Sequence, residues 1–317
     1  MRADETDAIN IVVSEREMVA DGVVRVEFRS PEGADLPEWS PGAHIDVHLP
    51  AMIRQYSLCG DPGERDRYAI AVLKQPDGRG GSRYVHGRLE VGTSLTISAP
   101  RNRFELVDAP GYCFVAGGIG ITPFLPMIND AISRNRPWKL FYGGRNAESM
   151  AFRELLSEYG PAVEITPEDQ FGVLNLRSIV DHLPREHMLY CCGPEGMLAA
   201  MEGSMPAEDL GRLHLERFAK SGEVHKPDDF AFTVECKESG CKVLVPAGVT
   251  ILDALIGAGV DANFECREGT CGTCELDVLD GAPDHRDSIL SPQERKMATI
   301  LFPCVSRANT PELVLDV

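Results

Sequence analysis

Apolar and polar residues alternate with a period of two from Asn10 to about Leu106. In the stretch Ala43–Leu49, for example, every second residue is apolar and the residues between them are His44, Asp46 and His48. This pattern is typical of antiparallel strands with one buried face, so we expect a small β-barrel in this part of the chain.

Two polar insertions interrupt the alternation, the first at Arg54–Leu58 and the second at Gly78–Ser82. The second is a run of glycines that ends in Ser82, a good N-cap residue, just before a helix-like segment. Free N–H groups at such a helix start would bind a phosphate. A plain hairpin loop is the alternative interpretation of this insertion.

The periodicity changes between Gly111 and Phe218, where strand-like runs alternate with helical ones. This βα pattern predicts a parallel sheet covered by helices, with ligands beyond the carboxyl ends of its strands. The expected strands are Tyr112–Ala116, Trp138–Tyr142, Ala162–Thr166 and Met188–Cys192, and the expected helices include Ala151–Tyr159 and Met197–Met201.

Glycine-rich turns follow the first and the last of these strands, at Ala116–Pro123 and Cys192–Met197. Gly118 and Gly120 would let the backbone approach a pyrophosphate, and a helix can begin at Thr122-Pro123. The third glycine of the Rossmann fingerprint is absent, because Pro123 stands in its place. A turn needed only for packing is therefore the competing interpretation.

Residues Ala219–Asp229 are polar and contain Gly and Pro, which predicts an interdomain linker. The remaining residues predict a small mixed sheet with one helix, Ile251–Ala258. Thr250 is the expected N-cap of that helix, with Asp253 three residues further on.

Four cysteines of this last part have the spacing of a plant-type [2Fe-2S] site. Four residues separate Cys266 from Cys271, two separate Cys271 from Cys274, and Cys304 follows after a long gap. Zinc competes as the metal, but zinc sites usually pair two Cys-x2-Cys motifs and here there is one. Ordinary buried thiols are the third possibility, and the other six cysteines are interpreted in that way.

Length and charge restrict the number of domains and the kinds of binding partner. A chain of 317 residues suits two or three domains, and its net charge of −18 disfavours nucleic acid. No apolar run reaches the roughly 20 residues of a membrane span, and the N-terminus has no apolar signal core, so we expect a cytoplasmic protein without a membrane partner. The acidity favours solubility, or steering toward a basic face on a protein partner.

Three motifs in this order resemble those of the ferredoxin-NADP reductase superfamily: Arg54-x-Tyr56-Ser57, the stretch from Gly117 to Pro123, and Cys192-Gly-Pro-x-x-Met197. With the C-terminal cysteine motif, the chain resembles the phthalate dioxygenase reductase type. The fold this implies is an antiparallel β-barrel flavin domain (1–107), an α/β parallel-sheet NAD domain (108–222), a linker (223–230) and a β-grasp ferredoxin domain (231–317).

The resemblance also implies which residues bind the flavin. The first strand contributes Arg54, Gln55, Tyr56 and Ser57, and a second strand at the polar edge of the ring contributes Ala71, Val72 and Leu73. The phosphate loop contributes Arg79, Gly80, Gly81 and Ser82, and the two residues beside the ring are Thr122 and Phe218. The terminal phosphate held by the loop favours FMN over FAD. For Phe218, a core aromatic at the end of a domain is the alternative.

For the nicotinamide coenzyme, the resemblance implies a cleft lined by Gly118, Gly120, Cys192, Gly193 and Pro194. Glu168 and Asp169 follow the third strand of the sheet, where an acid would bond a ribose 2′-hydroxyl and repel a 2′-phosphate. NADH is therefore favoured, although Arg145 leaves NADPH possible.

The expected function is that of the reductase of a Rieske-type oxygenase. Electrons would pass from NADH to FMN, then to a cluster held by Cys266, Cys271, Cys274 and Cys304, and finally one at a time to the oxygenase. No side chain is expected to act as a general acid or base. A free-standing NADH-dependent reductase of small oxidants and a redox sensor are the alternatives.

Overall fold

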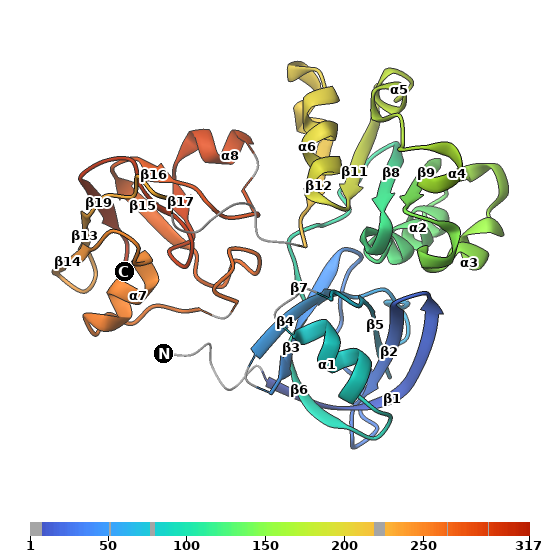
Figure 1. Ribbon diagram of the computed structural model, residues 1–317, viewed down its shortest axis with the longest axis horizontal. Coiled ribbons are helices and arrows are strands. Elements are labelled where there is room, and N and C mark those ends of the chain that lie inside the picture. Colours follow the sequence, from blue (N-terminus) through green and yellow to red (C-terminus); the bar gives the residue numbers. More distant parts are fainter. Residues whose placement is uncertain (1–7, 51, 77–79, 219–225, 265, 291) are drawn as a thin grey trace. The chain divides into compact units, whose positions relative to one another are not determined.

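The computed structural model describes residues 8–317 except 51, 77–79, 219–225, 265 and 291. For residues 292 and 293 it describes the backbone but not the side chains. The described chain forms two compact units, 8–216 and 217–317 (Figure 1). Within the described ranges, no helix has the length and apolar character needed to cross a membrane.

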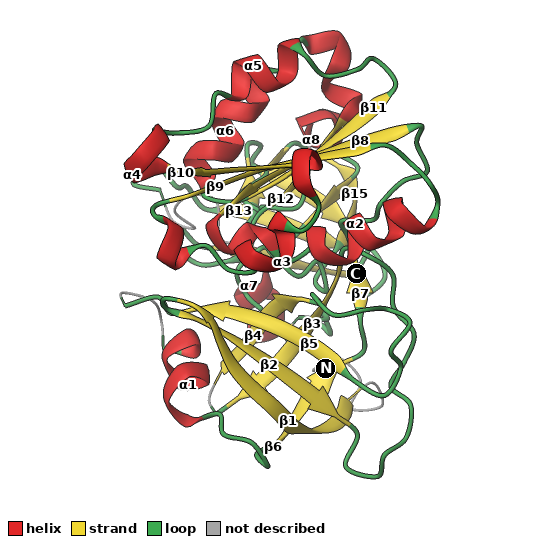
Figure 2. Cartoon of the chain, turned by 90° about the vertical axis from the view of Figure 1, so that its right-hand side faces the viewer, coloured by secondary structure: helices red, strands yellow, loops and turns green. Residues whose placement is uncertain are grey.

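The first part of the larger unit is an antiparallel barrel with strand order β4-β3-β6-β1-β2-β5, and β7 pairs with β3 (Figure 2). A bridge between Leu58 and Ile70 joins the end of β4 to β5 and so closes the sheet. The elements are β1 (Ala8–Ala20), β2 (Val23–Arg29), β3 (Ala43–Leu49), β4 (Met52–Ser57), β5 (Tyr68–Leu73), α1 (Gly81–Arg88), β6 (Ser94–Ser98) and β7 (Arg101–Asn102).

The alternation along β3 has its predicted consequence for the apolar residues, but His44 and Asp46 between them are buried as well. Ala43, Ile45, Val47 and Leu49 all belong to the barrel core, together with apolar residues of β1, β2 and β5. Burial of alternate side chains fixes the register of such a strand, because a slip of one residue would turn the apolar set outward. The predicted β-barrel is thus confirmed.

The second part of the larger unit is a five-stranded parallel sheet with strand order β10-β9-β8-β11-β12. Its strands are β8 (Gly111–Gly117), β9 (Trp138–Gly144), β10 (Val163–Pro167), β11 (His187–Cys192) and β12 (Leu213–Glu216). Its α-helices are α2 (Phe124–Ser133), α3 (Arg153–Ser157), α4 (Glu168–Phe171), α5 (Leu176–Asp181) and α6 (Glu195–Ser204), and its 3₁₀-helices are Gly118–Ile121, Ala147–Ser149, Gly160–Ala162 and Ala207–Arg212.

Both faces of this sheet are covered, as the continuous apolar run of β8 requires. Tyr112, Phe114 and Ala116 pack with α2, while Cys113 and Val115 pack with α5 and α6. Because β8 lies between β9 and β11, the strand order reverses beside it, and a crevice at the carboxyl ends of β8 and β11 is the expected ligand site.

The smaller unit is a mixed sheet of order β14-β13-β19-β15-β17, in which β13 and β19 are parallel. Helix α7 (Ile251–Gly257) buries Ile251, Leu252 and Leu255 in the same core, and the Thr250 hydroxyl accepts the Asp253 N–H as predicted. The other elements are β13 (Phe232–Cys236), β14 (Cys241–Val245), β15 (Leu276–Asp280), β16 (Pro283–Asp284), α8 (Pro292–Met297), β17 (Ile300–Leu301), β18 (Arg307–Ala308) and β19 (Glu312–Leu315).

The described end of the predicted linker is bound to the smaller unit. Asp229 is an ion-pair partner of Arg286, with Oδ1 2.6 Å from Nη2, and it lies 3.5 Å from Nε of Arg307. All three side chains are at most 6% exposed. The chain therefore joins the core of the smaller unit at Asp229, before β13 begins.

Candidate functional site

Strand β4 carries the four residues predicted to line the flavin. Its antiparallel pairing places Arg54 opposite Val47 and Tyr56 opposite Ile45, so these two side chains share the face that borders the barrel core. Gln55 lies on the other face, where its amide donates to Asp46 at 3.4 Å. Burial raises the pKa of Tyr56 to about 12, against the opposing effect of Arg54, so the phenol stays protonated.

Helix α1 begins within the predicted phosphate loop, but its cap is not the predicted one. The N-cap is Gly80, at φ 99°, and the helix starts at Gly81. Ser82 lies inside the first turn, and its hydroxyl accepts the backbone N–H of Gln75 at 3.0 Å. The prediction of Ser82 as cap was wrong because a glycine can take the left-handed conformation that this chain reversal requires. Arg79 lies outside the described residues.

The side chain of Arg54 crosses the start of α1. A Cβ atom added to Gly81 would lie 2.7 Å from Cγ and 2.8 Å from Nε of Arg54, which is closer than any side chain tolerates. The first turn of α1 contains no acidic residue. A guanidinium beside the free N–H groups of a helix start fits a phosphate group.

Strand β5 carries the predicted residues Ala71, Val72 and Leu73 and is held against the same helix. The carbonyl of Val72 lies 2.8 Å from Nε2 of His86 in α1. The barrel therefore places β4, β5 and the start of α1 together, as an FMN site with its phosphate at α1 would require.

At the switch point of the parallel sheet, the two predicted glycine turns pack against each other. A Cβ atom on Gly120 would lie 2.2 Å from the carbonyl oxygen of Cys192 and 2.8 Å from the nitrogen of Gly193. A Cβ atom on Gly117 would lie 2.7 Å from Pro194. Gly120 thus permits close approach of one turn to the other.

Gly118 differs from these glycines. Its φ of 56° is left-handed, and an added Cβ atom would meet nothing within 4 Å. The backbone here faces open space, which is the arrangement that a bound pyrophosphate needs. Thr122, predicted to touch the flavin, is buried, and its hydroxyl donates to the carbonyl of Ile119 at 3.1 Å.

One residue of this region was missed by sequence reasoning. Glu216, the last residue of β12, accepts the Ser57 hydroxyl at 3.4 Å and the Cys192 thiol at 3.7 Å through the same oxygen. Burial, which removes the carboxyl from water, raises the pKa of Glu216 to about 8, although the hydrogen bonds from Cys192 and Ser57 act in the opposite direction. Glu216 is therefore a protonated acid at neutral pH. The signal in the sequence that could have pointed to Glu216 was its position two residues before Phe218.

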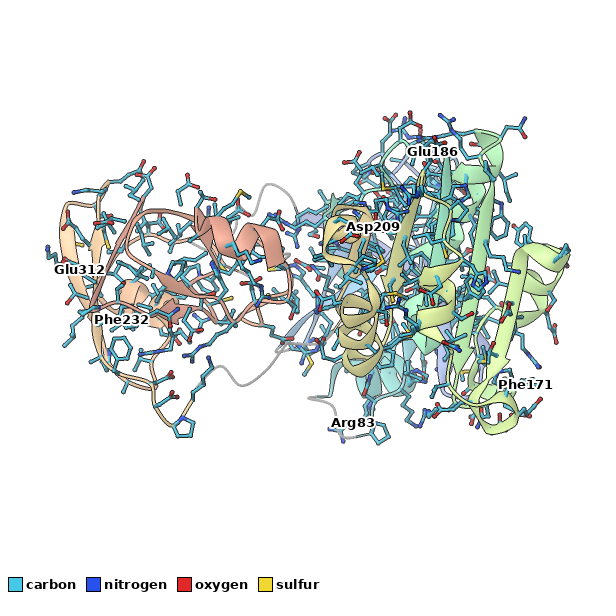
Figure 3. All side chains as sticks on the ribbon, turned by 90° about the horizontal axis from the view of Figure 1, so that it is seen from above. Arg83, Phe171, Glu186, Asp209, Phe232 and Glu312 are labelled. Atoms are coloured by element: carbon cyan, nitrogen blue, oxygen red, sulfur yellow. The ribbon has the colours of Figure 1, made fainter. Side chains whose placement is uncertain are left out.

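The residues predicted to read the coenzyme ribose are close together. Strands β9 and β10 are parallel neighbours, and the Asp169 N–H donates to the Arg145 carbonyl at 3.2 Å. Arg145, Glu168 and Asp169 are exposed. Phe171, which ends α4, is 71% exposed, and Figure 3 shows it at the margin of the domain.

In the smaller unit, the four motif cysteines interact in pairs, although within the described residues no three metal-binding side chains are arranged closely enough to hold a metal ion. Hydrogen bonding from Cys271 and from Cys304 lowers the pKa of the Cys266 thiol, and Cys304 also interacts with Cys274. The Glu268 N–H donates to the Cys266 sulfur at 3.3 Å. Cys271, Cys274 and Cys304 are at most 3% exposed. Four converging thiols with a backbone donor fit an iron–sulfur cluster.

The cysteine loop is packed tightly at Gly269, where φ is 69°. An added Cβ atom would lie 2.6 Å from a Val305 methyl and 3.0 Å from Cα of Asp287. The Ser288 N–H donates to the Gly269 carbonyl at 2.8 Å. Asp287 is fully buried, and its carboxylate accepts the N–H groups of the two residues that follow Ser288. This turn supports the cysteine loop from outside.

Phe218 falls in the smaller unit, two residues past the end of β12, and is 43% exposed. Its predicted contact with the flavin concerns the other unit, so its role stays a prediction.

The fold and these sites define a class: an oxidoreductase that combines a nicotinamide-binding domain with an iron–sulfur domain. Two family models agree with this. Residues 114–203 match the oxidoreductase NAD-binding domain, and residues 232–309 match the 2Fe-2S iron-sulfur cluster binding domain.

Whole-chain relatives define the family more narrowly. The chain is 40% identical over 300 residues to phenoxybenzoate dioxygenase subunit beta of Ectopseudomonas oleovorans, covering 94% of this chain and 93% of that protein. It is 38% identical to tetrachlorobenzoquinone reductase of Sphingobium chlorophenolicum, covering 98% of each. It is also 38% identical to vanillate O-demethylase oxidoreductase of Pseudomonas sp. strain HR199, covering 97% and 99%.

Solved structures give the same result. Phthalate dioxygenase reductase superposes with a TM-score of 0.71 at 34% identity, covering 99% of both chains. An intact type IV self-sufficient cytochrome P450 monooxygenase superposes with a TM-score of 0.88 at 40% identity over 98% of this chain, which spans about two-fifths (41%) of that structure. The chain belongs to the phthalate dioxygenase reductase family, whose cofactors are FMN, NADH and a [2Fe-2S] cluster and which transfers electrons to an oxygenase.

Proposed function

We propose that the FMN phosphate binds between Arg54 and the start of α1, with the ring along Tyr56 and Ser57. The close approach of Arg54 to Gly81 supports this placement, because it brings a cationic side chain beside the first turn of α1, where a phosphate could accept hydrogen bonds from both. The loop residues Gly80 and Ser82 and the strand residues Ala71–Leu73 complete the site. When bound, the flavin supplies the conversion between a two-electron hydride donor and a one-electron acceptor.

We infer that Cys266, Cys271, Cys274 and Cys304 are the four ligands of the cluster. The observation that carries this assignment is their mutual approach in the structure, where Cys266 interacts with Cys271 and Cys304 and Cys304 interacts with Cys274. Their plant-type spacing agrees with it. The smaller unit then acts as the one-electron carrier of the chain.

For the nicotinamide coenzyme, we propose binding across the turns that carry Gly118 and Gly193, with NADH preferred over NADPH. Two exposed carboxylates, Glu168 and Asp169, follow β10, where we expect the coenzyme ribose, and the exposed Arg145 is bound to Asp169 through its backbone carbonyl. Like-charge repulsion of the additional phosphate disfavours NADPH.

One side chain of the protein, that of Glu216, positions polar groups at the place where the flavin and the nicotinamide are proposed to meet. Glu216 keeps its proton at neutral pH and accepts hydrogen bonds from Ser57 and Cys192. A neutral carboxyl holds these two polar groups in place without adding a charge that would oppose the arrival of a hydride donor. Its role is positioning.

We propose a Rieske-type oxygenase as the electron acceptor. The relatives include proteins named as components of dioxygenase and demethylase systems, and this chain matches them over nearly its whole length. A cytoplasmic location is part of the proposal, since none of the ten cysteines is paired in a disulfide, as is usual in a reducing compartment. The proposal also includes three domains with the limits 1–107, 108–222 and 231–317.

A haem-containing oxygenase of the cytochrome P450 type is the second candidate for the electron acceptor. The observation in its favour is the TM-score of 0.88 with the self-sufficient cytochrome P450, which exceeds the 0.71 found with phthalate dioxygenase reductase. Direct reduction of a quinone is a third candidate, favoured by the similarity to tetrachlorobenzoquinone reductase.

An anaerobic titration with NADH tests the proposal. We expect the flavin absorption to bleach and a rhombic EPR signal of a reduced [2Fe-2S] cluster to appear at low temperature. Bleaching without that signal would contradict the cysteine assignment. Stopped-flow mixing of the reduced chain with a Rieske oxygenase, a cytochrome P450 or a benzoquinone then separates the three acceptors by their rates.

A further inference from the structure

Two cysteines outside the cluster motif face each other across a hairpin. In the antiparallel pair β13–β14, Cys236 lies directly opposite Cys241. All ten cysteines lie among the described residues, and Cys236 with Cys241 is the one pair that strand register places opposite each other.

The strand register brings the Cα atoms of this pair to a distance that a disulfide can span. Lys237 donates its N–H to Leu315 of β19, so the backbone groups of Cys236 point the other way, toward β14. Directly opposite residues that exchange backbone hydrogen bonds have Cα atoms about 5.5 Å apart, which is within the range that disulfides span. Their Cβ atoms are also about 5.5 Å apart, so the hairpin must close by about 1 Å for the two sulfurs to bond. The turn between the two cysteines is fixed by Gly240, whose N–H donates to the Cys236 carbonyl at 2.9 Å.

The two side chains also differ in access. Cys236 is 0% exposed and lies in the core of the sheet, while Cys241 packs against that core and is partly exposed. Burial raises the pKa of Cys236 to about 12, so this thiol stays protonated. An oxidant from solvent therefore reaches Cys241 first.

We propose that Cys236 and Cys241 form a reversible oxidation site, in which a hydroperoxide converts the two thiols into a cross-strand disulfide. Cys241, as its thiolate, attacks one oxygen of the hydroperoxide, the O–O bond breaks, and the leaving oxygen takes up a proton as water or an alcohol. Cys236 then attacks the Cys241 sulfur, the S–O bond breaks, and the hydroxide leaves as water with the proton of Cys236. Two thiols and one hydroperoxide thus give one disulfide, one water and one further water or alcohol.

The disulfide would act on the end of the chain as well as on the hairpin. Lys237 and Ser239 of the turn donate to the carbonyls of Leu315 and Val317 at 3.0 Å. Strand β19 is the central strand of this sheet, and Figure 3 marks β13 and β19 by Phe232 and Glu312. The cross-link therefore fixes the turn to which the last residues of β19 are bound.

The test uses the whole cluster-loaded protein and hydrogen peroxide, at doses that leave the visible absorption of the cluster intact. Trypsin cleaves after Lys237 and so places the two cysteines in separate peptides, one of them Glu238–Lys242. After alkylation of free thiols and non-reducing digestion, we expect the two peptides joined, with the mass of two hydrogens lost, and separated again by dithiothreitol.

Matched variants make the result specific. Cys241→Ser should abolish the joined peptides and leave the Cys236 peptide alkylated, whereas Cys113→Ser, in the other unit, should leave the cross-link unchanged. Recovery of both wild-type peptides as separate alkylated species would overturn the proposal. Oxidation of Cys241 to a sulfonic acid without cross-linking would do the same, as would a cross-link that appears only after the cluster absorption has gone.

Discussion

Ser57 and Glu216 lie within hydrogen-bonding distance, 3.4 Å between Oγ and Oε2, although 159 positions separate them in the sequence. Ser57 ends β4 of the barrel, and Glu216 ends β12 of the parallel sheet. This contact joins the two parts of the larger unit at the place where the proposed flavin and nicotinamide sites meet. It also leaves a protonated carboxyl at that place.

The raised pKa of Glu216 has a consequence for stability. The folded-state pKa of about 8 exceeds the ordinary value of 4.5, so the folded chain binds more protons than the unfolded chain between these pH values. We expect the free energy of unfolding to fall as the pH rises toward 8, by at most about 1.4 kcal/mol per pH unit, and to level off above it. Glu216→Gln should remove this dependence.

Urea unfolding at several pH values measures the effect. The chain's two tryptophans, Trp39 and Trp138, both lie in the unit that contains Glu216, so their fluorescence reports that unit alone. Glu164→Gln removes an exposed carboxyl from the same unit and serves as control. An equal pH dependence in wild type and Glu216→Gln would show that the carboxyl is ionised at neutral pH.

Gly81 tests the proposed phosphate site. Gly81→Ala would place a methyl group 2.7 Å from Cγ of Arg54 and so displace its guanidinium from the helix start. We expect the affinity for FMN to fall roughly ten-fold or more, since a lost charge-assisted bond costs about 1.4 kcal/mol or more. Fluorescence titration of flavin-free protein with FMN measures it.

Gly87 lies on the same helix and an added Cβ atom there would meet nothing within 4 Å. Gly87→Ala is therefore the matched control, and it should retain the FMN affinity of the wild type. Similar losses in both variants would mean that the helix itself, rather than the position of Arg54, responds to substitution.

Much of this architecture could be predicted because it depends on local patterns. The alternation in Ala43–Leu49 and the apolar run of β8 fix the faces that strands must bury, and Thr250 and Asp253 specify a helix start within four residues. The cysteine motif depends on spacing alone. Each of these signals lies within a short stretch of sequence.

The remaining features depend on contacts between distant segments. Glu216 acquires its raised pKa only when β12 reaches Ser57, and no short stretch contains that contact. Gly120 was predicted from the motif to let the backbone approach a pyrophosphate, whereas the structure shows the backbone of Cys192 next to it. The capping role of Gly80 depends on a left-handed backbone angle, which local propensity did not distinguish from a cap at Ser82.

Gly269 tests the support of the cysteine loop. Gly269→Ala would bring a methyl group within 2.6 Å of Val305 and 3.0 Å of Asp287, so the loop must shift. We expect the iron content to fall below half of the wild-type value, because the shift separates thiols that must converge. Iron and sulfide analysis measures it.

The control for Gly269 is another left-handed glycine of the same unit. Gly248 has φ 74°, and an added Cβ atom would meet nothing within 4 Å. Gly248→Ala imposes backbone strain of about 1 kcal/mol without a collision and should keep its iron. Loss of iron in both variants would assign the effect to backbone strain alone.

Coenzyme choice tests the acidic pair after β10. The double change Glu168→Gln and Asp169→Asn removes two negative charges while retaining the Asp169 N–H bond to Arg145. We expect kcat/KM for NADPH to rise about ten-fold, with a much smaller change for NADH, since each relieved repulsion contributes on the order of 0.5–1 kcal/mol. Steady-state ferricyanide reduction measures both values. An unchanged ratio would place the 2′-phosphate elsewhere.

Cys271→Ser tests the separation of the two electron-transfer steps. Loss of one thiolate should remove the cluster, and with it the reduction of cytochrome c, because a one-electron carrier is then missing. NADH-dependent ferricyanide reduction should stay near the wild-type rate, since the proposed flavin and nicotinamide residues other than Phe218 lie in the other unit. Cys241→Ser, a change in the same unit at a cysteine outside the motif, should retain both activities. If Cys271→Ser lost both, electrons could not follow the proposed order, and the cluster would have to take part in the first step.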